Sequence, residues 1–115
     1  MSNEAIGGNT VVLVIAEEPQ AAFAGGTLIP FARREWEVLR ELVEVPGQVR
    51  TTKDLSRDNP GAAKYVCRRL RRKLGGYGLQ DVLIHHRGWG YRYIGPVRKV
   101  GTIQEALGVE QSAVK

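Results

Sequence analysis

A dense run of basic residues is the feature of this sequence with the clearest chemical meaning. Five of the six residues from Arg68 to Lys73 are cationic, and no acidic residue occurs between Lys64 and Gly76. A solvated helix face normally mixes both signs of charge, because opposite charges four positions apart stabilise a helix and like charges repel. An unbalanced run therefore favours a polyanionic partner that relieves the repulsion.

Two alternatives for this run are a solvated surface without a partner and a patch that binds an anionic membrane. Membrane binding requires an exposed apolar face beside the charges. On a helical wheel at about 100° per residue, the apolar residues of this segment form a single arc that we expect the core to bury. Nucleic acid is then the favoured polyanion. The arc consists of Ala63, Val66, Cys67, Leu70 and Leu74.

Positive charge is concentrated in the middle of the chain. The 115 residues carry a net charge of +5. Residues 1–48 hold seven acidic and three basic residues, whereas residues 49–99 hold three acidic and thirteen basic residues. Such a one-sided distribution steers polyanions toward one face of a fold.

Composition is that of an ordinary globular protein of one domain, with 43% hydrophobic and 25% charged residues. No apolar stretch approaches the roughly 18 residues of a membrane span, and the N-terminus lacks the features of an export signal. A single cysteine, Cys67, fits a reducing compartment. We therefore expect a cytoplasmic, nucleoid-associated protein with no membrane partner.

Metal binding and catalysis have little support in the sequence. His85 and His86 are adjacent on a predicted strand, so their side chains point to opposite faces of it. Zinc-type spacing of paired Cys or His residues is missing, and the acidic residues are not paired as a general acid and base. We expect no cofactor, no metal, no small-molecule substrate and no enzymatic activity.

Strands and helices alternate in blocks along the chain. The β-branched segment Thr10–Ala16 predicts a strand, and Ala21–Ile29 predicts a weaker strand or strand pair broken at Gly25–Gly26. An amphipathic helix follows and ends at Pro46–Gly47. Thr51, with an acidic residue three positions later, caps a short second helix, and the pair Asn59–Pro60 starts a third. The three helical segments are residues 32–47, 52–58 and 60–74.

Two β-rich runs, "VLIHH" and "GYRYIG", flank "RGWG" and predict a hairpin. Tyr91 and Tyr93 lie two positions apart, and we expect both to pack in the core. For Trp89 the alternatives are contact with a ligand at the hairpin tip and packing back onto the hairpin. The order of elements predicts an α+β fold: a winged helix-turn-helix with N-terminal strands, three helices and a C-terminal β-hairpin wing.

Domain boundaries follow from these elements. Residues 1–9 are expected to be a flexible N-terminus and residues 10–95 a winged-helix domain. Residues 96–115 are expected to be a tail, either solvated or containing a short helix that Thr102 and Glu105 would cap.

Three motifs, in order, resemble the OmpR/PhoB-type winged-helix DNA-binding domain. They are an amphipathic helix ending near Pro-Gly, a helix closing on L-R-x-K-L, and a wing written R-G-x-G-Y-R-[FY]. The resemblance runs from about Val11 to Gly95 and includes "LRELVEVPGQVRTTKDL", "RRLRRKLG" and "IHHRGWGYRYIG". It implies a bacterial, archaeal or phage transcriptional regulator that binds double-stranded DNA. Recognition helix 60–74 would lie in the major groove and wing 82–94 in the minor groove.

Twelve residues make up the expected DNA site. Arginine reads guanine through two hydrogen bonds, and flanking cations hold phosphates. The resemblance implies that Arg69 reads a base and that Arg92 enters the minor groove. We expect Arg69→Ala to relax specificity and Lys73→Ala to weaken all sequences alike. The base-contacting set is Lys64, Tyr65, Arg68, Arg69 and Arg72; the phosphate set is Thr51, Lys53, Arg71 and Lys73; and the wing set is Arg87, Trp89 and Arg92.

The sequence departs from the family at three points. Lys64 and Val66 stand where the family usually has Asp and His, so a different operator is expected. The segment "SRDNPGAA" is shorter than the family's loop that touches RNA polymerase, and no receiver domain is expected. Two alternatives therefore stay open: an architectural, excisionase-like DNA-bending protein, and a protein-interaction module that contacts RNA polymerase. A homodimer on DNA is compatible with each DNA-binding role.

Overall fold

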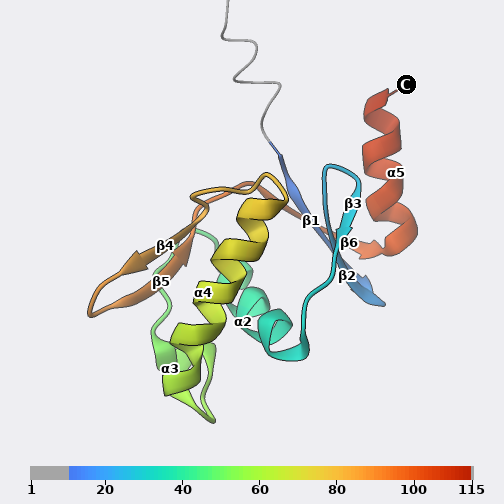
Figure 1. The fold of residues 1–115 in the computed structure, drawn as a ribbon. Coiled ribbons are helices and arrows are strands. Elements are labelled where there is room, and N and C mark those ends of the chain that lie inside the picture. The colour runs from blue at the N-terminus through green and yellow to red at the C-terminus, as the bar shows by residue number, and fades with distance from the viewer. Residues whose placement is uncertain (1–10, 115) are drawn as a thin grey trace, which may run out of the picture.

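The computed structural model describes residues 11–114, and the N-terminus expected to be flexible, residues 1–9, lies outside them. A four-stranded sheet lies on one side of three helices, a two-stranded hairpin lies on the other, and a last helix covers the outer face of the larger sheet (Figure 1). The elements are β1 (Leu13–Glu18), β2 (Gln20–Ala24), β3 (Thr27–Ile29), α2 (Arg33–Glu44), α3 (Thr52–Leu55), α4 (Pro60–Gly76), β4 (Leu83–His86), β5 (Gly90–Tyr93), β6 (Val97–Thr102) and α5 (Ile103–Val114).

Strand β1 is buried on both faces, which explains its continuous apolar sequence. Leu13 and Ile15 pack in the main core, whereas Val14 and Ala16 pack in a second cluster beneath α5. This division follows from the alternation of side chains along a strand. The pair of strands predicted around Gly25–Gly26 forms as the β2–β3 hairpin, and both glycines have positive φ.

The C-terminal segment differs from the expected tail. Residues 97–102 form β6, which pairs in parallel with β1 and extends the sheet past residue 95. The local sequence "VRKVGT" has no strand-like alternation, so the strand depends on the open edge that β1 offers. Helix α5 then begins with the capping box expected there: Glu105 N–H donates to the Thr102 hydroxyl (3.0 Å), and Thr102 N–H donates to the Glu105 carboxylate (2.9 Å).

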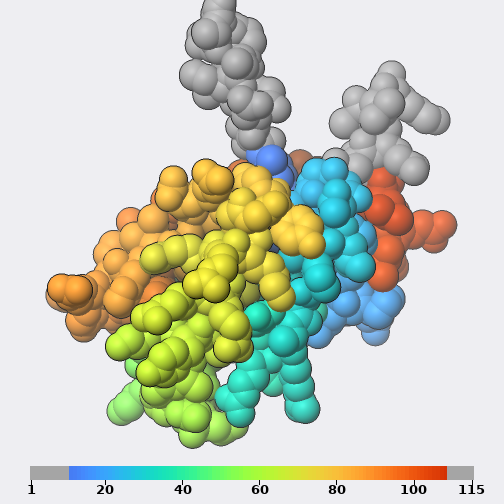
Figure 2. Space-filling view, in the orientation of Figure 1, coloured from blue at the N-terminus to red at the C-terminus, as the bar shows by residue number. Residues whose placement is uncertain are grey.

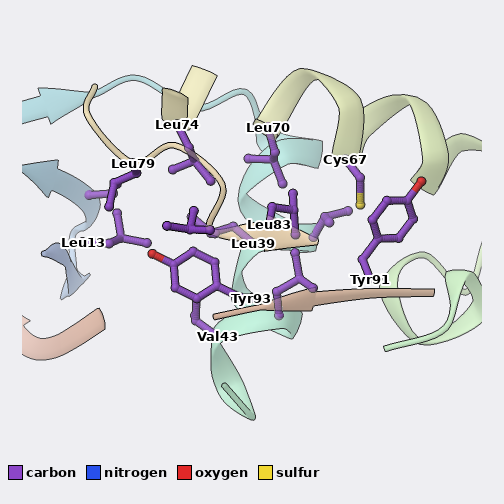
Figure 3. Packing of buried hydrophobic residues seen from close by; sticks show 14 of the residues in the cluster. Leu13, Leu39, Val43, Cys67, Leu70, Leu74, Leu79, Leu83, Tyr91 and Tyr93 are labelled. Carbon is purple, nitrogen blue, oxygen red and sulfur yellow. The ribbon is translucent and has the colours of Figure 1, made fainter. Parts of the chain in front are cut away.

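The main core lies between α2, α4 and the two sheets (Figure 3). All five residues of the apolar arc on α4 are buried, as the wheel predicted, and so are Tyr91 and Tyr93. Burial raises the pKa of the Cys67 thiol to about 12, so Cys67 is a small buried apolar residue. Helix α3 ends at Leu55, earlier than the expected Asp58, and α4 extends to Gly76 instead of ending at Leu74.

The hairpin, called the wing from here on (β4, residues 87–89 and β5), is attached to the start of α3 by backbone hydrogen bonds. Arg50 N–H donates to the Tyr91 carbonyl (2.7 Å), and Tyr91 N–H donates to the Arg50 carbonyl (2.9 Å). Gly90 has a φ of 146°, and a Cβ atom at this position would overlap the Arg50 carbonyl. Only glycine allows this approach, which fixes the wing against the helices.

Glu35, in the first turn of α2, is a buried carboxylate that binds two cations of α4. It accepts hydrogen bonds from Lys73 Nζ (2.7 Å), Arg69 Nε (3.3 Å) and the Ala32 N–H (2.9 Å). Burial alone raises the pKa of Glu35, but the hydrogen bonds from Lys73, Ala32 and Arg69 outweigh it and hold the pKa below its ordinary value. The acid-free run on α4 is therefore partly balanced by an acid that lies 34 positions before Arg69.

We expect Gly90→Ala to push the wing away from residues 50–51. Overpacking of this kind lowers the free energy of unfolding by about 1–3 kcal/mol. Gly88→Ala is the matched control, because Gly88 also has a positive φ but has open space where a Cβ would lie. The control should lose about 1–2 kcal/mol of stability from backbone strain alone. Gly90→Ala should lose more, because the overlap with Arg50 adds to the same kind of strain. Equal losses in urea denaturation would contradict the close-approach argument.

We expect Glu35→Gln to lower the free energy of unfolding at neutral pH by about 1–3 kcal/mol, because charge-assisted hydrogen bonds are lost. The lowered pKa means that Glu35 stabilises the fold above its ordinary value of 4.5 and loses this contribution as pH falls through the folded-state pKa. The gap between wild type and variant should therefore shrink in acid. Urea titrations at about pH 7 and about pH 3 measure it, and a gap that stays constant would refute this role.

Candidate nucleic-acid interface

The start of α3, the outward side of α4 and the wing surround one hollow of about 830 Å³. These elements come from separate segments of the chain and share one face of the molecule (Figure 2). The wing's attachment at Arg50 sets the distance between the wing and α4. Six of the twelve residues predicted to contact DNA line the hollow: Thr51, Lys53, Lys64, Arg68, Arg87 and Trp89.

All five residues of the predicted base-contacting set are exposed on α4. Lys64, Arg68 and Arg72 are spaced by four, so they form one row along the helix. Tyr65 is also exposed, and the Arg68 guanidinium lies over its ring at 5.9 Å from the centroid. None of the three cations forms an ion pair with a residue that the structure describes. This row is available to a ligand.

The other three cations of α4 contact the protein itself. Arg69 and Lys73 bind Glu35, and Lys73 also donates to the Pro30 carbonyl (2.8 Å). Arg71 donates from Nε to the Leu83 carbonyl at the base of the wing (3.3 Å). These residues lie on the two edges of α4 that meet α2 and β4. The predicted DNA contacts of Arg69, Arg71 and Lys73 stay predictions, and each would have to form beside or in place of these contacts within the protein.

The wing brings Arg87, and not Arg92, to the hollow. Arg92 pairs with Ile84 in the hairpin register, on the strand face opposite Tyr91 and Tyr93. Its Nε atom is buried and has no hydrogen-bond partner among the described residues. Strand alternation thus directs Arg92 away from α4, and its expected entry into the minor groove stays a prediction. Trp89 is 75% exposed, which rules out the alternative that it packs back onto the hairpin.

At the start of α3, the Thr51 side chain takes part in a capping box with Asp54. Its hydroxyl oxygen accepts from the Asp54 N–H (3.1 Å), and Asp54 accepts from the Thr51 N–H (3.0 Å). This backbone hydrogen bond is the main reason that the pKa of Asp54 is lowered. The neighbouring Arg50 guanidinium is held by Glu41 (2.7 Å), so it does not join the exposed cations.

His85 also lines the hollow, and the sequence did not single it out as a binding residue. Its ring stacks on Tyr91, with centroids 4.4 Å apart. Burial, and then the nearby Arg71, Arg87 and Lys64, lower the pKa of His85. The ring is therefore neutral at physiological pH. Only the hairpin register, which places His85 opposite Tyr91, reveals this position.

Other chemistry would require a metal site or a membrane-spanning helix among the described residues. No group of three or more His, Cys, Asp or Glu side chains there is arranged to hold a metal ion. No helix in the same part of the chain has the length and apolar character needed to cross a membrane.

Comparison with known proteins identifies the fold. No protein-family model matches the sequence, and no curated protein matches it. The structure is similar to the DNA-binding domain of the response regulator AdeR, solved in complex with an intercistronic region. The TM-score is 0.67 at 22% sequence identity, and the match covers 73% of this chain and 95% of that chain. The strands, helices and hairpin therefore form the same winged-helix fold as that domain, as the sequence motifs predicted.

Proposed function

We propose that this chain is a sequence-specific regulator of transcription that binds double-stranded DNA. The observation that carries the proposal is the cationic hollow between α4, the start of α3 and the wing. Similarity to a DNA-binding domain solved with an intercistronic region supports it.

The dimensions of B-DNA agree with this surface. A helix with its side chains is about 10–12 Å across and fits a major groove about 12 Å wide. With α4 in the major groove, the wing reaches the adjacent minor groove, and the hollow receives the phosphate chain between them. Thr51 and Lys53 on one side and Arg87 on the other then hold phosphates and fix the register.

In this proposal, the exposed row on α4 (Lys64, Arg68 and Arg72) contacts the base edges. Arg68 and Arg72 carry guanidinium groups that can donate two parallel hydrogen bonds to guanine. The Tyr65 ring beneath Arg68 limits the positions of that guanidinium, which reduces the entropy lost on binding. Lys64, one turn before Arg68, reaches the hollow and adds a contact to a base edge or phosphate.

Random-oligonucleotide selection with the purified chain tests the proposal. We expect a short enriched motif, bound at about 10⁻⁸ M or better at physiological salt, with affinity that falls steeply as salt rises. One motif or two equally spaced copies would show whether one or two chains bind. Recovery of no motif, with equal affinity for all duplexes, would contradict sequence-specific binding.

A matched pair of arginine variants tests the assignment of residues. Arg68→Ala and Arg69→Ala remove the same charge from adjacent positions of α4, but Arg69 is paired with Glu35. We expect Arg68→Ala to cost about 1–3 kcal/mol on the selected motif and to relax its base preference at one position. Arg69→Ala should leave the base preference unchanged. A gel-shift series over single-base variants measures both, and relaxed preference only in Arg69→Ala would reverse the assignment.

A further inference from the structure

Trp89 is a large apolar side chain held in solvent at the tip of the wing. At 75% exposure it is the most exposed large hydrophobic side chain among the described residues. Gly88 and Gly90 flank it, with φ values of 83° and 146°, and the Trp89 N–H donates to the His86 carbonyl (2.8 Å). The indole therefore projects from a defined, hydrogen-bonded turn.

The surroundings of Trp89 indicate what covers it. It lines the rim of the hollow together with Arg87, Lys64 and Arg68, so its nearest charged neighbours there are cations. Gly90 is packed against the Arg50 carbonyl, so the tip cannot turn away without breaking the attachment of the wing. An apolar side chain beside such charges fits a partner with negative charge outside and flat apolar surfaces inside. Double-stranded DNA has this chemistry in its phosphates and stacked base pairs.

We propose that Trp89 acts as a wedge that inserts between two base pairs from the minor groove and bends the duplex; this rests on the proposed DNA-binding function. Burial of the indole against unstacked bases offsets the cost of opening the step. Pyrimidine–purine steps such as TA unstack most easily, so Trp89 favours such a step at the wing's position. Arg87, beside it, holds the phosphate or groove wall where the duplex is deformed.

The fluorescence of Trp89 on the selected duplex is the direct test. Stacking between bases should quench the emission of the wild-type protein. Trp89→Ala should show no such quenching, because its remaining tryptophan, Trp36 of α2, packs against Phe31. Energy transfer between dyes on the two duplex ends should report a bend of about 20–90° with wild type and a straight duplex with Trp89→Ala. Affinity of Trp89→Ala should fall roughly 5- to 100-fold, the range for one aromatic stack.

Two further variants separate a wedge from an ordinary contact. Trp89→Phe keeps an aromatic ring and should keep most of the bend. Trp89→Lys should bind through phosphate attraction but leave the duplex straight. Replacing a TA step in the duplex by an AA step should lower the DNA affinity of the wild-type protein by a larger factor than it lowers the affinity of Trp89→Ala. Since Trp89 is solvent-exposed, the variants should unfold at the same urea concentration as wild type, which confirms that the comparison is between folded proteins.

Each contrary result has a distinct meaning. Specific binding with the same bend and quenching in Trp89→Ala and wild type would overturn the wedge and leave the proposed function standing. Quenching only on single-stranded DNA would overturn insertion into a duplex. Failure of wild type to bind any duplex would remove the proposed function and the wedge together.

Discussion

The backbone contact between Arg50 and Tyr91 is the constraint on which the surface depends. Two short hydrogen bonds join the wing to Arg50, two residues before α3, and Gly90 allows the two segments to approach closely enough to form them. Without that contact, the wing and α4 would be connected only through the hydrogen bond from Arg71 to the Leu83 carbonyl and the core residues beneath them. With it, the hairpin tip, the start of α3 and the exposed row on α4 keep a defined spacing, which a rigid ligand with regular charges requires.

The cations of α4 fall into two sets: three that contact the protein itself and three that face solvent. Glu35 binds Arg69 and Lys73, and the Leu83 carbonyl binds Arg71. These contacts lower the repulsion within a run of like charges and hold the helix against α2 and the wing. Lys64, Arg68 and Arg72 are then left as a row with no ion pair to a described residue. The dense run is therefore two sets of residues with different partners.

The wing tip unites two features that are costly in a protein without a partner. An exposed indole forgoes the free energy of burial, and clustered cations repel. Both lie around the same hollow, so one ligand with phosphates and flat apolar bases relieves both. The proposed wedge would relieve both costs at once, and it would make one protein both a regulator and a DNA-bending protein.

Local sequence patterns determined most of the secondary structure and the apolar face of α4, because periodicity and capping residues act over a few positions. The buried arc, the hairpin and the capping boxes at Thr51 and Thr102 were all predictable from such patterns. Strand β6 was not, since its pairing depends on the edge of a strand more than eighty residues earlier. Likewise, the positions of Glu35 and of the hairpin decide which cations of α4 form contacts within the protein. Tertiary packing determines which charged residues meet across a fold, and the local sequence of one helix does not specify those contacts.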